Sequence, residues 1–322
     1  MNRLAVILFC IVGSVYALAS NPSTYPPAEN AALRYWMAFA QMNDMAISPE
    51  DSIRMDEIVS GNAPWQEQRF GALVERNKDA IETMIRGTAL PYCEWGVEYD
   101  LGPAAPAAHL PKARALARLN RLYAVRLEST GNYDAAVRAI IAGIRFAQHM
   151  AQNASFLGVL TAKTALEADL VSVQQMTASH GLSTGQTSGL RNAIKELPEG
   201  AFDWSNAARL ESGGLHAAMS QMSRSSDARA LYQSWFGSAA PADFRVPGAS
   251  EIAQLDRVMG SYAQLLRMQP EAAVAQLPRL QKQIAILDPV SQIGIPNPQR
   301  LVSARAELIR ELRKAQTALK AE

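Results

Sequence analysis

The sequence predicts an all-α protein built of stacked helical hairpins, as an α-solenoid or an irregular helical bundle, with no sheet. Three observations predict this class. Apolar residues recur at helical spacing along most of the chain, residues that favour helix starts precede these segments, and alanine, the best helix former, is frequent throughout. Short β-branched groups such as "VSV" at 171–173 lie inside helical patterns, so we expect no strand.

In the first half of the chain, helix signals alternate with one long irregular stretch. The first helix follows two prolines and carries "AENAALRYWMAFAQM", and the second starts at Pro49 after the N-cap Ser48. A third, opened by Pro64, carries apolar residues as far as Met84. Residues 89–111 break the pattern with prolines and glycines, and such loops are often functional or simply packed.

From Pro111 the helical pattern returns and continues to the end of the chain. The expected segments are 111–131, a partner helix after the turn, 156–180, 183–198, a helix after Asp203, "DARALYQSWF", 250–268, a helix broken by Pro278, and a long final helix. Residues 237–249 look like a connector. The domain plan is therefore a main α-helical domain over 20–236, the connector, and C-terminal helices 250–322 packed on the main domain.

The first residues have the pattern of an export signal. Arg3 supplies the positive start, 4–18 is an apolar run, and Ala17-Leu18-Ala19 is a small-x-small cleavage site. We expect a signal peptide at 1–19, cleavage before Ser20, and a periplasmic or extracellular protein. The alternative is an uncleaved N-terminal membrane anchor, although the apolar run is shorter than the roughly 20 residues that a membrane span needs.

Charge and cysteine content narrow the range of partners. The formal net charge is +1, and loss of Arg3 with the signal would bring it to zero, so no nucleic-acid partner is expected. No second apolar segment is long enough to cross a bilayer, which predicts a soluble mature chain without a stable membrane span. Cys93 would be the one cysteine left, so no intrachain disulfide can form. The oligomeric state stays open.

The stretch "TGNYDAAVRAII" lies between two helical patterns and resembles one tetratricopeptide repeat unit over about 118–149. Gly131 and Tyr133 belong to the turn, and Ala124, Ala136 and Gly143 are small residues where the two helices would approach closely. The resemblance implies stacked helical hairpins. No second unit appears at the expected offset, so a lone hairpin in an irregular bundle remains the alternative.

A second resemblance covers the irregular stretch and the helix after it. "LPYCEWGVEYDLGP" followed by "HLPKARALARLNRL" is similar to a segment of a family of exported bacterial proteins to which no activity is assigned. This resemblance implies a shared fold and does not supply a reaction.

The sequence contains one pair of residues that could act as nucleophile and base. Cys93 is followed by His109, but a cysteine nucleophile needs a base within hydrogen-bond reach and a lowered pKa. Beside Trp95, Cys93 is more simply explained as a packed apolar residue of the loop. The histidines at 109, 149, 180 and 216 are scattered, and phosphate-binding and serine-nucleophile motifs are absent. We expect no metal, cofactor or catalytic residue.

One group of charges points to a binding surface. Arg114, Arg118 and Arg121 follow one another at i, i+4 and i+7 and therefore share one helix face. Arginine binds carboxylates and phosphates with two parallel hydrogen bonds, so this face could hold an anionic partner. The alternative is a solvated face or ion pairs to a neighbouring helix.

These observations together predict a non-enzymatic interaction or scaffold module of the periplasm or the extracellular space, for which another envelope protein or peptide is a possible partner. The first alternative is a hydrolase that uses the Cys93 and His109 loop. The second is a carrier that holds an apolar ligand between helices, in a pocket lined by the tryptophans Trp36, Trp65, Trp95, Trp204 and Trp235.

Overall fold

The computed structural model describes residues 29–43, 47–242 and 244–320 and confirms the all-α class. Within those ranges there are fourteen α-helices, one 3-10 segment and no strand. The predicted signal peptide and its cleavage site lie outside the described residues. The helices are α1 (Ala31–Gln41), α2 (Pro49–Val59), α3 (Glu67–Arg76), α4 (Lys78–Gly87), η2 (Tyr99–Ala104), α5 (His109–Ser129), α6 (Tyr133–Ala151), α7 (Phe156–His180), α8 (Thr184–Lys195), α9 (Trp204–Arg224), α10 (Ala228–Phe236), α11 (Ala249–Leu265), α12 (Pro270–Ala285), α13 (Pro289–Gly294) and α14 (Pro298–Ala318).

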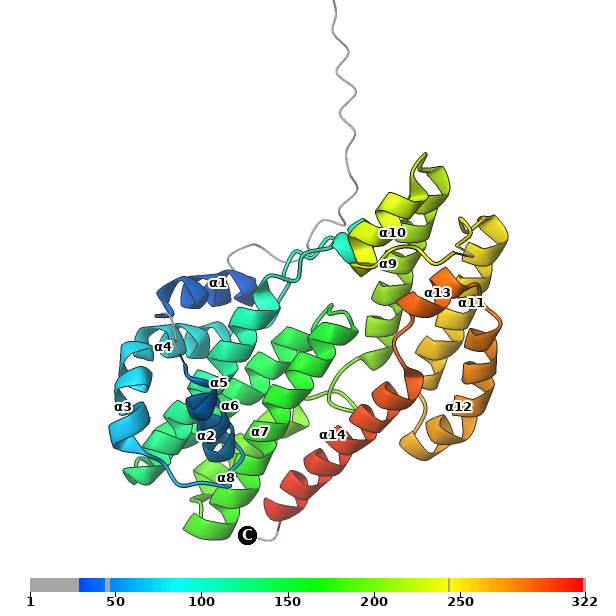
Figure 1. Cartoon of the computed structure of the whole chain (residues 1–322). Coiled ribbons are helices and arrows are strands. Elements are labelled where there is room, and N and C mark those ends of the chain that lie inside the picture. The colour runs from blue at the N-terminus through cyan, green and yellow to red at the C-terminus, as the bar shows by residue number, and fades with distance from the viewer. Residues whose placement is uncertain (1–28, 44–46, 243, 321–322) are drawn as a thin grey trace, which may run out of the picture.

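Three long consecutive helices form the centre of the molecule. α5 packs on α6, α6 packs on α7, and α7 also contacts α5. The short helices α1 to α4 lie against this centre on one side, as Figure 1 shows, and α9 to α13 lie on the other. α14 returns from that second group and packs along α7. The last helix therefore joins the two sides of the molecule.

The turn between α5 and α6 follows the chemistry of its residues. Gly131 has φ of 76°, in the left-handed region that glycine reaches without strain. Asn132 then caps α6 by accepting a hydrogen bond from the Ala135 amide at 3.4 Å. Ala124 and Ala136 are fully buried, Tyr133 is half-buried, and Gly143 lies against α7, where an added Cβ would be 2.3 Å from Asp169 Oδ2.

A buried asparagine also ties this hairpin together. The sequence has Asn120 at a position where an aliphatic residue would pack easily, and its side chain is 1% exposed. Its Nδ2 donates to the backbone carbonyl of Ala139 in α6 at 2.9 Å. A hydrogen bond between the two helices thus takes the place of a hydrophobic contact, and the buried Nδ2 donor has a partner.

Three details of the predicted helices are wrong. The helix expected from Pro64 to Met84 is two helices, because the buried Asn77 breaks it: Asn77 Nδ2 donates to the Leu73 carbonyl and its Oδ1 accepts the Asn43 amide. α12 continues through Pro278, which is exposed, so water can reach the carbonyl that the proline leaves free. The stretch expected to be irregular contains η2, and α5 begins at His109.

The segment at 237–249 links α10 to the start of α11. One continuous set of buried apolar residues nevertheless runs through the helices before and after it. α11 packs on α9 and α14 packs on α7, so the C-terminal helices share a core with the rest of the described chain. Among the described residues no helix is long and apolar enough to span a bilayer.

Candidate functional site

A pocket of about 380 Å³ lies between α2, α5 and α7, and all three arginines of the predicted anion-binding face line it. We call it the arginine pocket. Apart from the arginines, its wall is largely aliphatic. The apolar lining residues are Val59 of α2, Ala117 of α5, and Ala165, Ala168 and Val171 of α7. A volume in this range suits a small ligand or a few side chains of a partner.

The three arginines differ in burial and in their partners. Arg114 is exposed and makes no hydrogen bond or ion pair with another described residue. Arg118 bonds Asp56 of α2 at 2.8 Å and also reaches the hydroxyl and the carbonyl of Ser52. Arg121 has a side chain that is 3% exposed and pairs with Glu128 at 3.1 Å. The charge of Arg114 is therefore the one that nothing in the pocket balances.

Several polar atoms beside this pocket are buried without a hydrogen-bond partner. They include Nε of Arg118, Nε of Arg121 and Oδ1 of Asp169 on α7. Burial lowers the pKa of the Arg118 guanidinium, Asp56 opposes that change, and Arg114 adds to it. Each of these atoms costs free energy, because it is closed off from water and has no partner. A ligand in the pocket can instead reach the exposed Arg114 and the partly exposed Arg118.

Asp169 is the most unusual titratable group of this region. Its side chain is buried between α7 and the Gly143 position of α6, and burial raises its pKa to about 8. Arg121 opposes that rise but does not cancel it. At neutral pH the carboxyl group is therefore mostly protonated and adds little negative charge near the arginines.

The two carboxylates that line the pocket are already engaged. Asp56, whose side chain is 70% exposed, pairs with Arg118. Glu167 pairs with Lys163 at 2.8 Å, and Lys163 also reaches Glu307 of α14 at 3.3 Å. Neither acid is left to neutralise Arg114.

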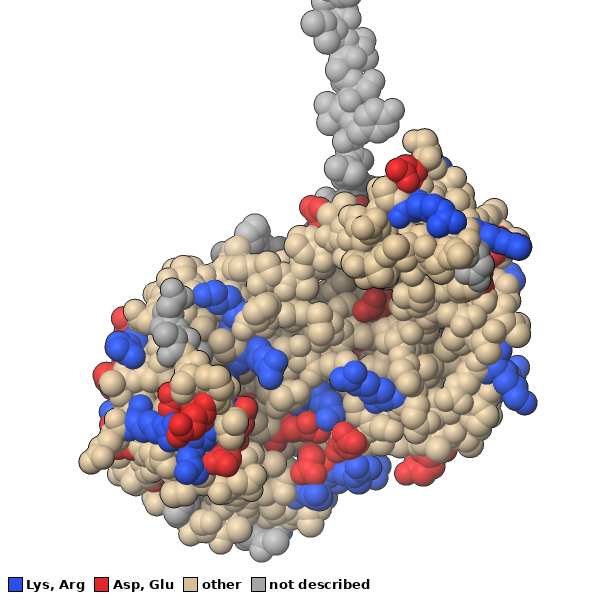
Figure 2. Space-filling model, viewed as in Figure 1, with Lys and Arg blue, Asp and Glu red and all other residues tan. Residues whose placement is uncertain are grey.

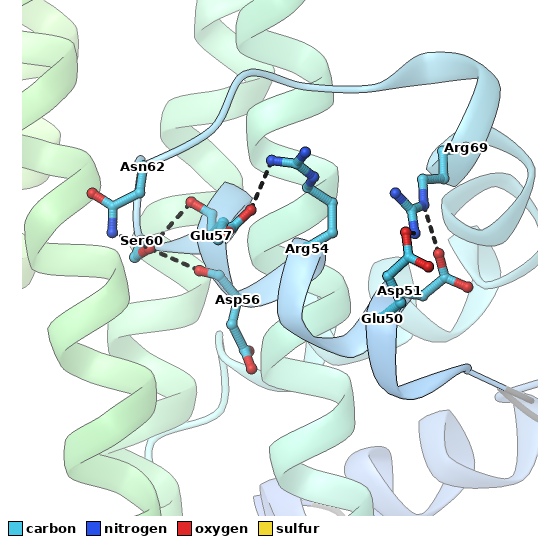
Figure 3. A network of polar contacts seen from close by, with 8 residues as sticks. All are labelled: Glu50, Asp51, Arg54, Asp56, Glu57, Ser60, Asn62 and Arg69. Atoms are coloured by element: carbon cyan, nitrogen blue, oxygen red, sulfur yellow. Dashed lines mark hydrogen bonds and ion pairs between the residues drawn. The ribbon is translucent and has the colours of Figure 1, made fainter.

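Ion pairs tie α3 to the first turn of α2, the helix whose other end lines the pocket. Figure 3 shows Arg69 of α3 directed at Glu50 and Asp51, in the first turn of α2, with N–O distances of 3.0 and 2.6 Å. Hydrogen bonds from Ser48 and Arg69 lower the pKa of Asp51. In the same view Asp56 points away from the separate Arg54 and Glu57 pair. These contacts leave Asp56 available to α5.

On the face drawn in Figure 2, basic and acidic side chains are interspersed over the helices. No extended patch of a single sign appears on that face.

The Cys93 loop forms a second buried group, which we call the aromatic cluster: Tyr35, Cys93, Trp95, His109 and His149. Trp95 stacks on His109 with ring centroids 4.4 Å apart, and its Nε1 donates to the His149 carbonyl at 3.2 Å. The Tyr35 hydroxyl and His149 Nδ1 lie 2.5 Å apart. Burial lowers the pKa of each histidine to about 4, so both rings are neutral at pH 7.

Cys93 lacks the environment that activates a nucleophile. It is fully buried, and burial, with a smaller contribution from Glu94, raises the pKa of its thiol. Within the described chain it makes no hydrogen bond with His109, which instead contacts the ring of Trp95. A reactive cysteine needs the opposite shift and a nearby base. The described residues contain no group of three potential metal ligands.

Four of the tryptophans lie against different aromatic neighbours. Trp36 and Trp95 are 6.4 Å apart, but Trp65 lies beside Phe70 and Trp204 beside Phe202. The arginine pocket contains no tryptophan.

No family model, curated protein or solved structure matches this chain.

Proposed function

We propose that this protein is a non-enzymatic interaction module of the cell envelope, whose arginine pocket binds an acidic, partly apolar segment of another envelope protein. One observation supports this most: three arginines line a pocket with aliphatic walls, and one of them has no partner among the described residues. A carboxylate of the partner would meet Arg114 and Arg118, and an apolar side chain next to it would cover Val59 and Val171.

Physical chemistry favours a mixed ligand of this kind. Hydrogen bonds to charged groups contribute about 1.5–3 kcal/mol each, which is larger than the contribution of an exposed ion pair. Each buried methylene group adds about 0.8 kcal/mol. A purely apolar ligand would leave Arg114 unpaired, and a purely charged one would leave the aliphatic wall in water.

The proposed location depends on the N-terminal pattern of 1–19, with cleavage between Ala19 and Ser20. N-terminal sequencing of the exported protein tests it. A mature chain that begins at Ser20 supports export and release, whereas a chain that still begins at Met1 replaces this with an anchored protein. The tetratricopeptide-like hairpin of α5 and α6 supports an interaction role by analogy of fold alone.

Site-specific photo-crosslinking in the native envelope tests the pocket. A photoreactive residue replaces Ala117, which lines the pocket, or Ala272, an exposed control residue on α12. We expect a discrete crosslinked partner from position 117 only, with an acidic and partly apolar peptide at the crosslink. Equal crosslinking from both positions, or none from 117, would contradict the proposal.

A charge reversal provides the second test. Arg114→Glu should weaken partner crosslinking at 117 by about tenfold or more, since loss of one charged hydrogen bond exceeds 1.4 kcal/mol. Arg279→Glu, on exposed α12, is the matched control and should leave it unchanged. Because Arg114 is exposed and has no described partner, neither variant should alter the melting temperature.

A second candidate follows from the volume and the aliphatic walls of the same pocket. An anionic amphiphile such as a medium-chain carboxylate would satisfy the same groups, which makes the protein a carrier. Calorimetric titration with octanoate distinguishes the two. Saturable octanoate binding that Arg114→Glu removes, together with no crosslinked protein at 117, would favour the carrier.

A further inference from the structure

A second pocket, of about 320 Å³, lies where the C-terminal end of α6 meets the turn before α9. It uses none of the residues of the arginine pocket. We call it the amide pocket after its polar lining: Gln148, His149, Gln152, Asn153, Asp203 and Asn206.

The His149 ring is held in place beside this pocket by a hydrogen bond. The residue is 6% exposed, and its Nδ1 is held by the Tyr35 hydroxyl at 2.5 Å. Burial raises the pKa of Tyr35, so the phenol keeps its proton and can donate it to Nδ1. The neutral ring then carries its own proton on Nε2. Within the described chain Nε2 has no hydrogen-bond partner, although the residue lines the cavity.

The amide side chains around it have unused hydrogen-bonding capacity. Gln148 makes no side-chain hydrogen bond with a described residue. Gln152 uses only its Oε1, which accepts the Cys93 amide at 2.9 Å, and so its two N–H donors are free. Asn206 Nδ2 lies 3.5 Å from Asn153 Oδ1, which is a long contact.

The charge of the pocket argues against an anionic ligand. No lysine or arginine lines it, and its one acidic lining residue is Asp203. Asp203 caps α9 by accepting the Asn206 amide at 2.8 Å, and Arg209 lies 3.8 Å from it. The carboxylate is thus already engaged, and the remaining groups are neutral donors and acceptors.

Backbone strain is concentrated at the same place. Asn153 and Ala201 are the two non-glycine residues of the described chain with positive φ, at 51° and 68°, and both line the pocket. Ala201 is fully buried, and Trp204 Nε1 holds the adjacent Gly200 carbonyl at 3.1 Å. Such conformations persist where the surrounding structure imposes them, and they are concentrated at ligand sites.

We propose that the amide pocket binds a neutral, hydroxyl-rich ligand, a saccharide unit. A sugar hydroxyl both donates and accepts hydrogen bonds, and side-chain amides offer both functions in one plane, so they fit such a ligand better than a charged one. The His149 Nε2 proton supplies a donor at a fixed position. Phe202, Pro91 and Pro198 supply apolar surface for the C–H faces of a sugar ring.

Titration with defined neutral sugars tests this. Glucose, N-acetylglucosamine and cellobiose are added to the exported protein up to about 30 mM, a concentration that nearly saturates a millimolar site. Binding is followed by saturation-transfer NMR and by the shift in melting temperature. We expect at least one of these sugars to bind. No response to any of the three overturns the proposal.

Two variants locate the site. Gln148→Ala combined with Asn206→Ala should weaken sugar binding by about tenfold or more, because two hydrogen bonds are lost. Gln264→Ala, an exposed glutamine of a groove between α11 and α12, is the matched control and should bind as the wild type does. Equal binding by both variants contradicts the assignment to this pocket. A response to ethanolamine but not to sugars replaces the neutral ligand with a cation.

Discussion

The arginine pocket and the aromatic cluster both include residues of α5, but they differ in how far their polar atoms have hydrogen-bond partners within the protein. In the aromatic cluster, burial keeps His109 and His149 neutral, and Trp95 and Tyr35 direct their polar atoms to partners. In the arginine pocket, Nε of Arg118 and of Arg121 are buried without partners, and the exposed Arg114 makes no hydrogen bond or ion pair with a described residue. The first arrangement contributes to stability, and the second leaves hydrogen-bonding capacity for a ligand.

The largest expected effect comes from removing the central ring of the aromatic cluster. Trp95→Ala removes a ring that stacks on His109, Tyr35 and Phe39, and should lower the free energy of unfolding by about 3–5 kcal/mol. Urea denaturation followed by circular dichroism measures it. A loss below about 0.5 kcal/mol, the range of most surface changes, would show that the cluster is not a packed core.

The second-largest expected effect is a loss of folding stability in acid, caused by the buried His109 of this cluster. The folded-state pKa of His109 is lowered from 6.5 to about 4, so below pH 6.5 the unfolded chain binds a proton that the folded chain does not. Stability from this group is complete above pH 6.5 and is lost as pH falls toward 4. For one proton, the free energy of unfolding falls by at most about 1.4 kcal/mol for each pH unit. Between pH 6.5 and pH 4 the loss from His109 is therefore roughly 3 kcal/mol.

His109→Phe keeps the ring on Trp95 and removes that titration. The variant should therefore lose less stability than the wild type between pH 6.5 and pH 4, as measured by urea denaturation at several pH values. Parallel curves for the two proteins would contradict a buried neutral His109.

Beside the arginine pocket, the pH dependence should have the opposite sign. The pKa of Asp169 is raised from 3.8 to about 8, so between these values the folded state keeps a proton that the unfolded state has lost. Its contribution to stability therefore falls as pH rises through this window and is constant above it. Between pH 6 and pH 8 the loss should be about 2 kcal/mol.

Asp169→Asn removes this loss, because the amide has a similar shape and no ionisation. Denaturant melts at pH 6, 7 and 8 should show a flatter profile for the variant than for the wild type. Asp100→Asn, at an exposed position, is the matched control. An unchanged slope in Asp169→Asn would mean that the carboxyl group is ionised in the folded protein.

The smallest effect concerns the contact between α6 and α7 behind the pocket. A Cβ at Gly143 would lie 2.3 Å from Asp169 Oδ2, so Gly143→Ala should cost about 1 kcal/mol by forcing the carboxyl group to move. Gly213→Ala in α9, where nothing lies within 4 Å of the added Cβ, should instead stabilise by up to about 1 kcal/mol. Thermal melts compare them. A more stable Gly143→Ala would show that the two helices are further apart.

Short-range patterns predicted much of this molecule, and long-range contacts account for what they could not. The periodicity of α5 placed Arg114, Arg118 and Arg121 on one face, and the positive φ of Gly131 follows from its place in the turn. The apolar walls come from α2 and α7, helices distant in sequence, and no local pattern pairs Arg118 with Asp56.

The same limit applies to the second pocket and to the cluster. His149 stood out in the sequence only as one of four scattered histidines, but it meets Tyr35 across 114 residues of chain. The break at Asn77 also depends on a distant backbone amide, that of Asn43. At both positions the sequence showed only a polar residue in an otherwise apolar segment, which does not identify its distant partner.

Arginine side-chain NMR tests the central contrast most directly. The Nε–H signals of the exported protein are recorded during titration with acidic peptides such as acetyl-Leu-Asp-Leu and with the neutral acetyl-Leu-Asn-Leu amide. We predict that the acidic peptides shift the signals of Arg114 and Arg118, the two side chains that would meet the carboxylate, while the Trp95 indole signal stays in place. Arginine signals that do not move at about 10 mM peptide, or that move equally with the neutral one, would contradict an anion-binding pocket.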